Sequence, residues 1–223
     1  MLKLKRFLLS SLLLLFAFYS VSYATEIDLI YNLSGPDGSD CEAAWHGARI
    51  AKHILHQNGT PIHLVLYNGQ SVSKLNAAIG KICAQSKSTP IVIGLGTQQE
   101  ITAAAQPLLA ANKIFIAAGN IGEYAEKTEL GDHFFFVSAK TTREEDPARA
   151  RFNKLYQERF HQEPTDTAYK GFNAVMLAAT ALGRTTNHSS LELAQTIKRL
   201  TENDSLSSYP LLTTGLSRMK NLS

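Results

Sequence analysis

PIVIGLGTQQEITAAAQPLLAANKIFIAAGN, residues Pro90–Asn120, is the stretch that decides the fold. It predicts a β-branched strand over Pro90–Gly94, then a helix, then a second strand over Lys113–Ala117. Thr97 and Glu100 form a T-x-x-E capping box, which marks the start of the helix. A helix that joins two parallel strands brings both strand ends and its own N-terminus to one edge of the sheet. In open α/β sheets this edge is where small ligands bind.

The same alternation of strand and helix precedes this stretch. After Asn120 it gives way to one isolated strand and a run of helices. The order predicts an α/β fold with a doubly wound, mostly parallel sheet of flavodoxin-like strand order, followed by C-terminal helices. We expect strands at 26–33, 61–67 and 132–137, and helices at 40–57, 72–85, 145–161, 165–184 and 189–202.

Short local signals mark the helix ends. Ser39 and Glu42 form a second capping box, Asn58-Gly59 is expected to close the first helix, and Asn112 to end the third. The first helix is predicted to bury the face that carries Ala44, Ala48, Ala51 and Leu55.

The first 24 residues have the pattern of a secretory signal peptide. A basic start is followed by the apolar run Phe7–Val21 and the small-x-small site Ser22-Tyr23-Ala24. We expect cleavage after Ala24, with an uncleaved anchor as the alternative. The predicted organisation is a signal peptide over 1–24, one domain over 25–205 and a loose tail over 206–223. The mature chain is expected to be exported, without stable insertion in the membrane.

Charge and cysteine content indicate which partners and which cross-link the chain is expected to have. The predicted signal peptide holds three basic residues and no acid, so its removal takes the formal charge from +3 to 0. Nothing in this balance indicates a nucleic-acid partner. Cys41 and Cys83 are predicted at opposite sheet edges, near the start of one helix and the end of the next. This placement argues against a disulfide, although export would permit one.

A polar constellation lies on the first helix. Its members fall within about 80° of one another on the helix surface, and they are Glu42, His46, Arg49, His53 and His56. We interpret them as a solvated polar face. Adventitious metal binding by the histidines is the alternative, which the central Arg49 disfavours.

No enzyme signature is found in the sequence. The glycines of Gly94-Leu-Gly96 fit neither a dinucleotide-binding motif nor a P-loop, and the motifs G-x-S-x-G, C-x-x-C and H-E-x-x-H are missing. We therefore expect no catalytic residue, no metal and no cofactor.

Four fragments, in order, resemble one protein family. They are Leu33-Ser-Gly-Pro36 with Gly47-Ala48, then Val92-Ile93-Gly94, then Ile116-Ala-Ala-Gly-Asn120, and finally Phe135-Phe-Val-Ser138 with Phe152, Tyr156, Glu163-Pro164, Tyr169 and Asn173-Ala-Val175. The chain is similar, over about 26–182, to the type I periplasmic binding proteins that capture leucine, isoleucine, valine or related ligands for ABC transporters.

The resemblance implies a ligand site and a departure from the family. Family members clamp the ligand between two lobes, whereas only about a dozen residues here separate the segments that flank the second lobe. The chain therefore looks like a single lobe. A natural single-lobe protein, a degraded gene and a mis-assigned reading frame remain open. Carried onto this sequence, the site comprises Ser34, Asp40, Asn68, Thr97, Gln98, Gln99, Asn120 and Ile121.

Two functions follow from this reading. The first is a periplasmic solute-binding domain for amino acids or similar small ligands, linked to an ABC permease, with a weak or degenerate site. Gln98 and Gln99 replace the serines that the family commonly uses, and Asp40 and Glu100 add negative charge that opposes a ligand carboxylate. The alternative is a periplasmic interaction module that has lost its ligand and associates with itself or with another protein.

Overall fold

The computed structural model describes residues 25–33, 35, 38–85, 89–95, 98–118, 131–137 and 147–202. The predicted signal peptide and C-terminal tail lie outside the described residues, as do the predicted site residues Ser34, Thr97, Asn120 and Ile121. The elements in chain order are β1 (Thr25–Tyr31), α2 (Gly38–Gln57), β2 (Ile62–Asn68), α3 (Val72–Ala84), β3 (Ile91–Leu95), α4 (Gln98–Ala110), β4 (Ile114–Ala117), β5 (Phe134–Phe136), α6 (Pro147–Phe160), α7 (Asp166–Arg184) and α8 (Ser190–Glu202).

One five-stranded parallel sheet organises the fold. Its order is β2-β1-β3-β4-β5, and β1 lies between β2 and β3, with Leu29 opposite Leu66 on one side and Ile93 on the other. This confirms the predicted α/β class and flavodoxin-like order. The strand predicted at 132–137, outside the strand–helix alternation, is shorter than expected, and it pairs in parallel with β4. Its three phenylalanines, Phe134–Phe136, pair with β4 and so extend the sheet by one edge strand.

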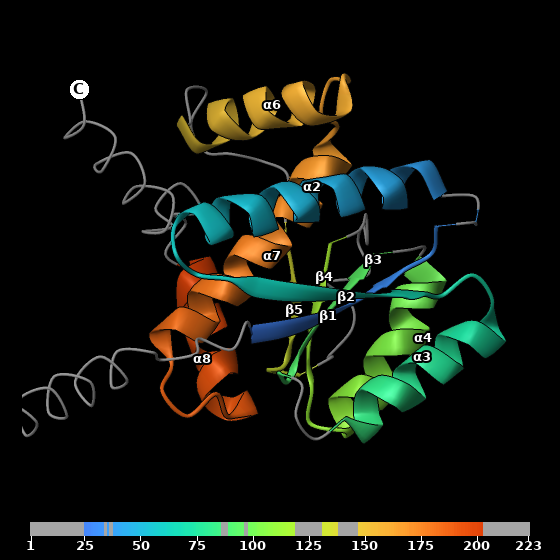
Figure 1. Cartoon of the computed structure of the whole chain (residues 1–223). Helices are drawn as coiled ribbons and strands as arrows, with labels where there is room; N and C mark the ends of the chain where they lie inside the picture. Colours follow the sequence, from blue (N-terminus) through green and yellow to red (C-terminus); the bar gives the residue numbers. More distant parts are fainter. Residues whose placement is uncertain are drawn as a thin grey trace, which may run out of the picture.

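Helices cover both faces of the sheet, and each face has its own core. In Figure 1, α2 and α7 lie on one side of the strands and α3 and α4 on the other. Alternate residues of β1 point to opposite sides, so Ile27 and Leu29 enter the larger core with α2, α7 and α8, while Ile30 enters the smaller core with α3 and α4. Cys41 lies in the larger core and Cys83 borders the smaller one, and no disulfide joins them in the described residues.

Two helices end in the same hydrogen-bonded motif. After α2, the N–H groups of Gly59 and Thr60 donate to His56 and Leu55, and Gly59 has φ +76°. After α4, Asn112 has φ +57° and takes the place that glycine has after α2, so that its N–H donates to Leu109. These are Schellman motifs, which satisfy carbonyls of the last turn. The predicted ends of both helices are confirmed.

The predicted start of α2 was two residues too late. The helix begins at Gly38, so Ser39 lies inside the first turn instead of preceding it. Gly38 already follows a turn in which its N–H donates to the carbonyl of Gly35 at 2.9 Å, and this turn starts the helix earlier than the capping box indicated.

Helices α2 and α7 cross at two glycines. A Cβ atom on Gly47 would lie 1.8 Å from the carbonyl oxygen of Ala168, and one on Gly171 would lie 2.1 Å from that of Ala44. The two backbones are therefore in direct contact, which only glycine permits. Helix α7 is buried around most of its circumference between α2, α8 and the sheet.

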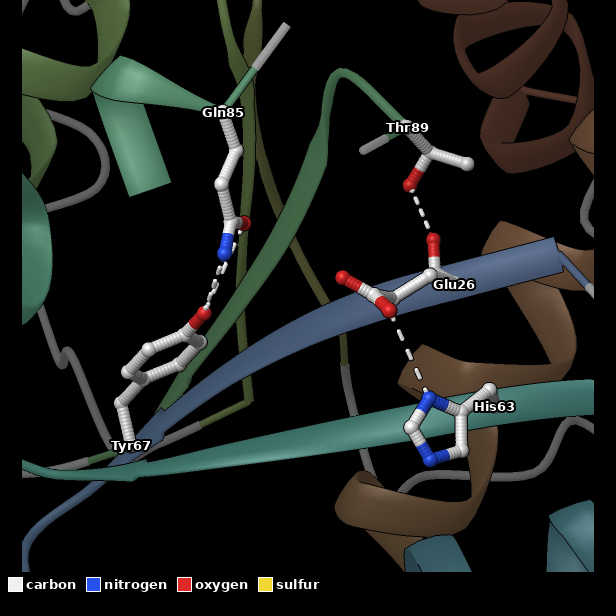
Figure 2. Close-up of polar contacts among 5 residues, drawn as sticks. All are labelled: Glu26, His63, Tyr67, Gln85 and Thr89. Atoms are coloured by element: carbon white, nitrogen blue, oxygen red, sulfur yellow. Dashed lines mark hydrogen bonds and ion pairs between the residues drawn. The ribbon is translucent and has the colours of Figure 1, made fainter. Parts of the chain in front are cut away.

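Two polar contacts join the starts of β1, β2 and β3, and a third joins the end of α3 to Tyr67 near the end of β2 (Figure 2). The hydroxyl of Thr89, just before β3, donates to the carbonyl of Glu26 on β1 at 2.6 Å. The Glu26 carboxylate lies 3.5 Å from Nδ1 of His63, its neighbour in register on β2. At the end of α3, Gln85 Nε2 donates to the Tyr67 hydroxyl at 3.1 Å. These side-chain contacts supplement the backbone ladder that joins β1 to β2 and β3.

Candidate ligand-binding edge

The C-terminal edge of the sheet gathers three strand ends and three helix starts. Tyr31 at the end of β1 is in register with Asn68 of β2 and Leu95 of β3. Helices α2, α3 and α4 each begin within a few residues of these strand ends. Helix N-termini present backbone N–H groups and favour negative charge. The predicted edge therefore exists, and its strands hold it in a defined register.

The structure places four of the eight predicted site residues. Asp40 lies in the first turn of α2, Asn68 is the last residue of β2, and Gln99 lies in the first turn of α4, and all three are exposed. Gln98 is the first residue of α4, and its side chain is outside the described part. The placed residues all lie at the same sheet edge, on separate elements.

A buried hydrogen bond at this edge was missed in the sequence. Asn32 follows β1 directly and is only 7% exposed, and its side-chain amide donates to Oε1 of Glu100 at 2.5 Å. The bond joins the loop after β1 to the first turn of α4. Glu100 was predicted as a capping residue and as a charge that opposes an anionic ligand. In the structure its carboxylate accepts a hydrogen bond from the Asn32 amide.

A signal for this contact exists in the sequence, although it is weak. Asn32 is a polar residue directly after a buried strand, which is a common position for site residues in α/β folds. Its partner, however, lies 68 residues further along the chain. Gly35 packs against the Asn32 amide so closely that a Cβ there would lie 2.5 Å from Nδ2. The glycine of the Leu33–Pro36 motif therefore leaves room for the amide.

The hollow beside this hydrogen bond is very small. It measures about 10 Å³, which is room for a single water. Gly94 forms part of its wall, and a Cβ on Gly94 would lie 2.2 Å from the ring of Phe115. The phenylalanine therefore fills the space beneath the edge. The whole lining comprises Ile30, Asn32, Gly69, Leu75, Gly94, Leu95, Glu100, Ile101, Ala104 and Phe115.

The start of α3 is capped by its own chain. The Ser71 hydroxyl accepts from the N–H of Lys74 at 3.3 Å, and the Lys74 ammonium donates to Gln70 Oε1 at 2.7 Å. This cap uses one of the free N–H groups of the first turn. A ligand at this edge would therefore depend more on α2 and α4 than on α3.

An apolar layer with one phenol lies beneath α2 at this edge. Tyr31 is fully buried, its ring meets Trp45 edge to face at 6.4 Å, and its hydroxyl has no hydrogen-bond partner among the described residues. Burial raises the pKa of Tyr31 far above its ordinary value, and the nearby Cys41 raises it further. The phenol is therefore neutral and packs in the core.

Within the described ranges, no three His, Cys, Asp or Glu side chains come close enough together to hold a metal ion.

Comparison by sequence finds no matching protein-family model and no matching curated protein. Comparison by structure finds clear likeness. A Rhodospirillum rubrum protein ascribed to a branched-chain amino acid ABC transporter aligns with a TM-score of 0.68 at 9% identity, over 78% of this chain and 89% of that one. The substrate-binding protein LivJ of Streptococcus pneumoniae, solved in complex with isoleucine, gives 0.61 at 13% identity, over 78% and 88%.

A third solved structure agrees with these two. An ABC transporter substrate-binding protein from Sphaerobacter thermophilus gives a TM-score of 0.59 at 12% identity, over 79% of this chain and 86% of that one. At such low identity the likeness concerns the arrangement of strands and helices, which is the arrangement the sequence resemblance implied. No helix in the described ranges is long and apolar enough to span a bilayer. The described part of this chain therefore has the fold of the type I periplasmic binding proteins.

Proposed function

We propose that this chain is a non-catalytic, exported solute-binding lobe that holds small ligands such as amino acids weakly at the C-terminal edge of its sheet. The observation that carries the proposal is the edge itself, where exposed Asp40, Asn68 and Gln99 surround the starts of α2 and α4 on a fold shared with LivJ. Ser34, Thr97, Gln98, Asn120 and Ile121 complete the proposed site. An ABC permease is the proposed partner in transport.

Weak binding is expected because the described edge offers little enclosure. Ligand pockets commonly bury 70–90% of a small molecule, whereas the hollow beside Asn32 holds about one water. A single lobe leaves the other side of the ligand in solvent. We therefore expect a millimolar Kd unless a second protein covers the edge.

Isothermal calorimetry with isoleucine, leucine and valine at millimolar concentration tests the proposal. The first-turn carboxylate of Asp40 repels a ligand carboxylate, so Asp40→Asn is expected to lower the Kd about twofold. Asp132→Asn is the matched control. Asp132 is also an exposed acid, but it lies in the turn before β5, at the end of the strand away from the proposed site. Micromolar affinity of the monomer would contradict the weak-site proposal, and no heat at any concentration would contradict ligand binding.

One observation favours the alternative interaction module. Phe136 is 54% exposed on β5, the strand at one edge of the sheet. An exposed aromatic side chain on an edge strand is a ready contact for another chain. Light scattering of the wild type and Phe136→Ser distinguishes the functions: a wild-type dimer that the variant loses supports the module, and a monomer in both excludes self-association through β5.

A further inference from the structure

Helix α6 lies along α2 (Figure 1), and its Phe152 and Tyr156 belong to the larger core. The two helices run antiparallel, because the N-terminal half of α6 meets the end of α2 and the last residue of α6 meets its first half. At one end, Arg151 Nη2 donates to Gln57 Oε1 at 3.3 Å. At the other end, the ring of Phe160 stacks on His46 with centroids 3.9 Å apart and an interplanar angle of 8°.

This packing corrects the prediction of a solvated polar face on α2. Part of that face lies under α6: the His46 side chain is only 19% exposed, and the Arg49 guanidinium lies 5.4 Å from the Phe160 ring. The physical reason is that α6 presents a row of aromatic residues, which needs a surface to cover. Imidazole and guanidinium groups can stack on such rings despite being polar.

Between these two contacts the helices part and leave a groove. We call it the α2–α6 groove, and its volume is about 290 Å³. This is close to the lower limit of about 300 Å³ for small-molecule pockets. It is lined by Ile50 and His53 from α2 and by Leu155, Glu158 and Arg159 from α6. Ile50 is 1% exposed and Leu155 half-buried, so the base of the groove is apolar, while Glu158 and Arg159 are exposed at its rim.

The charges at the rim are unequally matched. The Glu158 carboxylate has a cation of its own helix beside it, Lys154, with Nζ 3.9 Å from Oε1. Across the described residues, neither the Arg159 guanidinium nor the His53 ring has an ion-pair or hydrogen-bond partner. The groove therefore combines an apolar base with an unpaired guanidinium, a planar donor group that matches the geometry of a carboxylate.

We propose that the α2–α6 groove binds a short aliphatic carboxylate of about four to eight carbons. Its chain lies on Ile50 and Leu155, and its carboxylate accepts hydrogen bonds from Arg159, with His53 as a second donor. The groove is bounded at both ends by the Arg151–Gln57 and His46–Phe160 contacts. A peptide or helix running along it would have to break one of them, so the fit is to a small molecule rather than to a protein segment. This site is separate from the proposed site at the sheet edge.

The test is a titration of the full mature chain with sodium hexanoate, followed by two-dimensional amide NMR. We expect saturable shifts centred on Ile50, His53, Leu155 and Arg159. Hexanamide, which has the same chain without the charge, should bind at least tenfold more weakly, and hexylamine should not bind. Asp40→Asn, at the sheet edge, should leave hexanoate binding unchanged.

The matched variants are Arg159→Gln and Arg184→Gln. Both arginines are exposed in the last turn of their helices, but Arg184 belongs to α7 and lies outside the groove. Arg159→Gln should weaken hexanoate binding about tenfold, and Arg184→Gln should leave it unchanged. The proposal is overturned if the shifts do not saturate, if hexanamide or hexylamine binds as tightly as hexanoate, or if both variants behave alike.

Discussion

Gly47 and Gly171 mark the point at which the backbones of α2 and α7 touch. A methyl group at either position would overlap a carbonyl oxygen of the other helix, at 1.8 Å from Ala168 or 2.1 Å from Ala44. Neither obstacle is the end of a flexible side chain, so the helices themselves must move apart. Because α7 is buried among α2, α8 and the sheet, such a shift disturbs the whole larger core.

Gly47→Ala is therefore expected to lower the free energy of unfolding by about 3 kcal/mol, as measured by urea denaturation. Gly80→Ala is the control, because Gly80 lies on the exposed side of α3 with nothing within 4 Å of an added Cβ. That variant should be stabilised by about 0.5–1 kcal/mol through helix propensity alone. Equal effects of the two substitutions would show that the helices do not meet as described.

His46 gives the α2–α6 contact a pH dependence. Burial under α6 lowers the pKa of His46 below its ordinary 6.5, the Glu42 carboxylate raises it in part, and Arg49 lowers it further. A lowered histidine pKa means that the unfolded chain takes up the proton more readily than the folded chain. The contribution of His46 to stability is thus complete above the unfolded pKa and declines as the pH falls below about 6.5.

The measurement is urea denaturation between pH 5 and 8 for the wild type, His46→Gln and His56→Gln. The decline in stability below pH 6.5 should be smaller in His46→Gln than in the wild type. His56→Gln, which replaces an exposed histidine in the last turn of α2, is the control variant. A slope unchanged by His46→Gln would contradict the assignment.

At the scale of single elements, the cap of α3 can be tested by itself. The Ser71 hydroxyl accepts from the N–H of Lys74, and Ser71→Ala leaves that donor without its cap. We expect a loss of about 1 kcal/mol in unfolding free energy. Ser73→Ala, two residues further on and equally exposed, should change stability by only a few tenths of a kcal/mol and serves as the control.

Local signals were enough to predict most elements, and distant contacts account for what was missed. Asn58-Gly59 and Asn112 fix helix ends because the motif that stops a helix is made within six residues. The Asn32–Glu100 bond joins positions 68 residues apart, and the contact of α6 with α2 joins positions about 100 apart. No window of sequence contains either pair. The α2–α6 groove escaped prediction for the same reason, since only the packing of α6 creates it.

At the scale of the whole molecule, the sheet divides the interior into a larger and a smaller core, built by different helices. The larger core joins α2, α6, α7 and α8 to one face, and the smaller core joins α3 and α4 to the other. The strand order that separates them followed from the alternation of strands and helices in the sequence, because parallel strands need crossover helices. The candidate site could be predicted only as an edge, since its described residues come from separate elements that the folded sheet brings together.

The two cysteines, one inside the larger core and one bordering the smaller core, make this division measurable by thiol labelling. Cys41 is fully buried, whereas Cys83 is half-buried beside the smaller core. With Ellman's reagent, Cys83 should react in the native state. Cys41 should react about a thousandfold more slowly, because the reagent can reach its thiol only after the larger core opens. In Cys83→Ser the remaining rate should rise with urea in step with global unfolding, and a Cys41 rate equal to that of Cys83 would contradict the description. The two native thiols thus report separately on local and global opening, without any introduced probe.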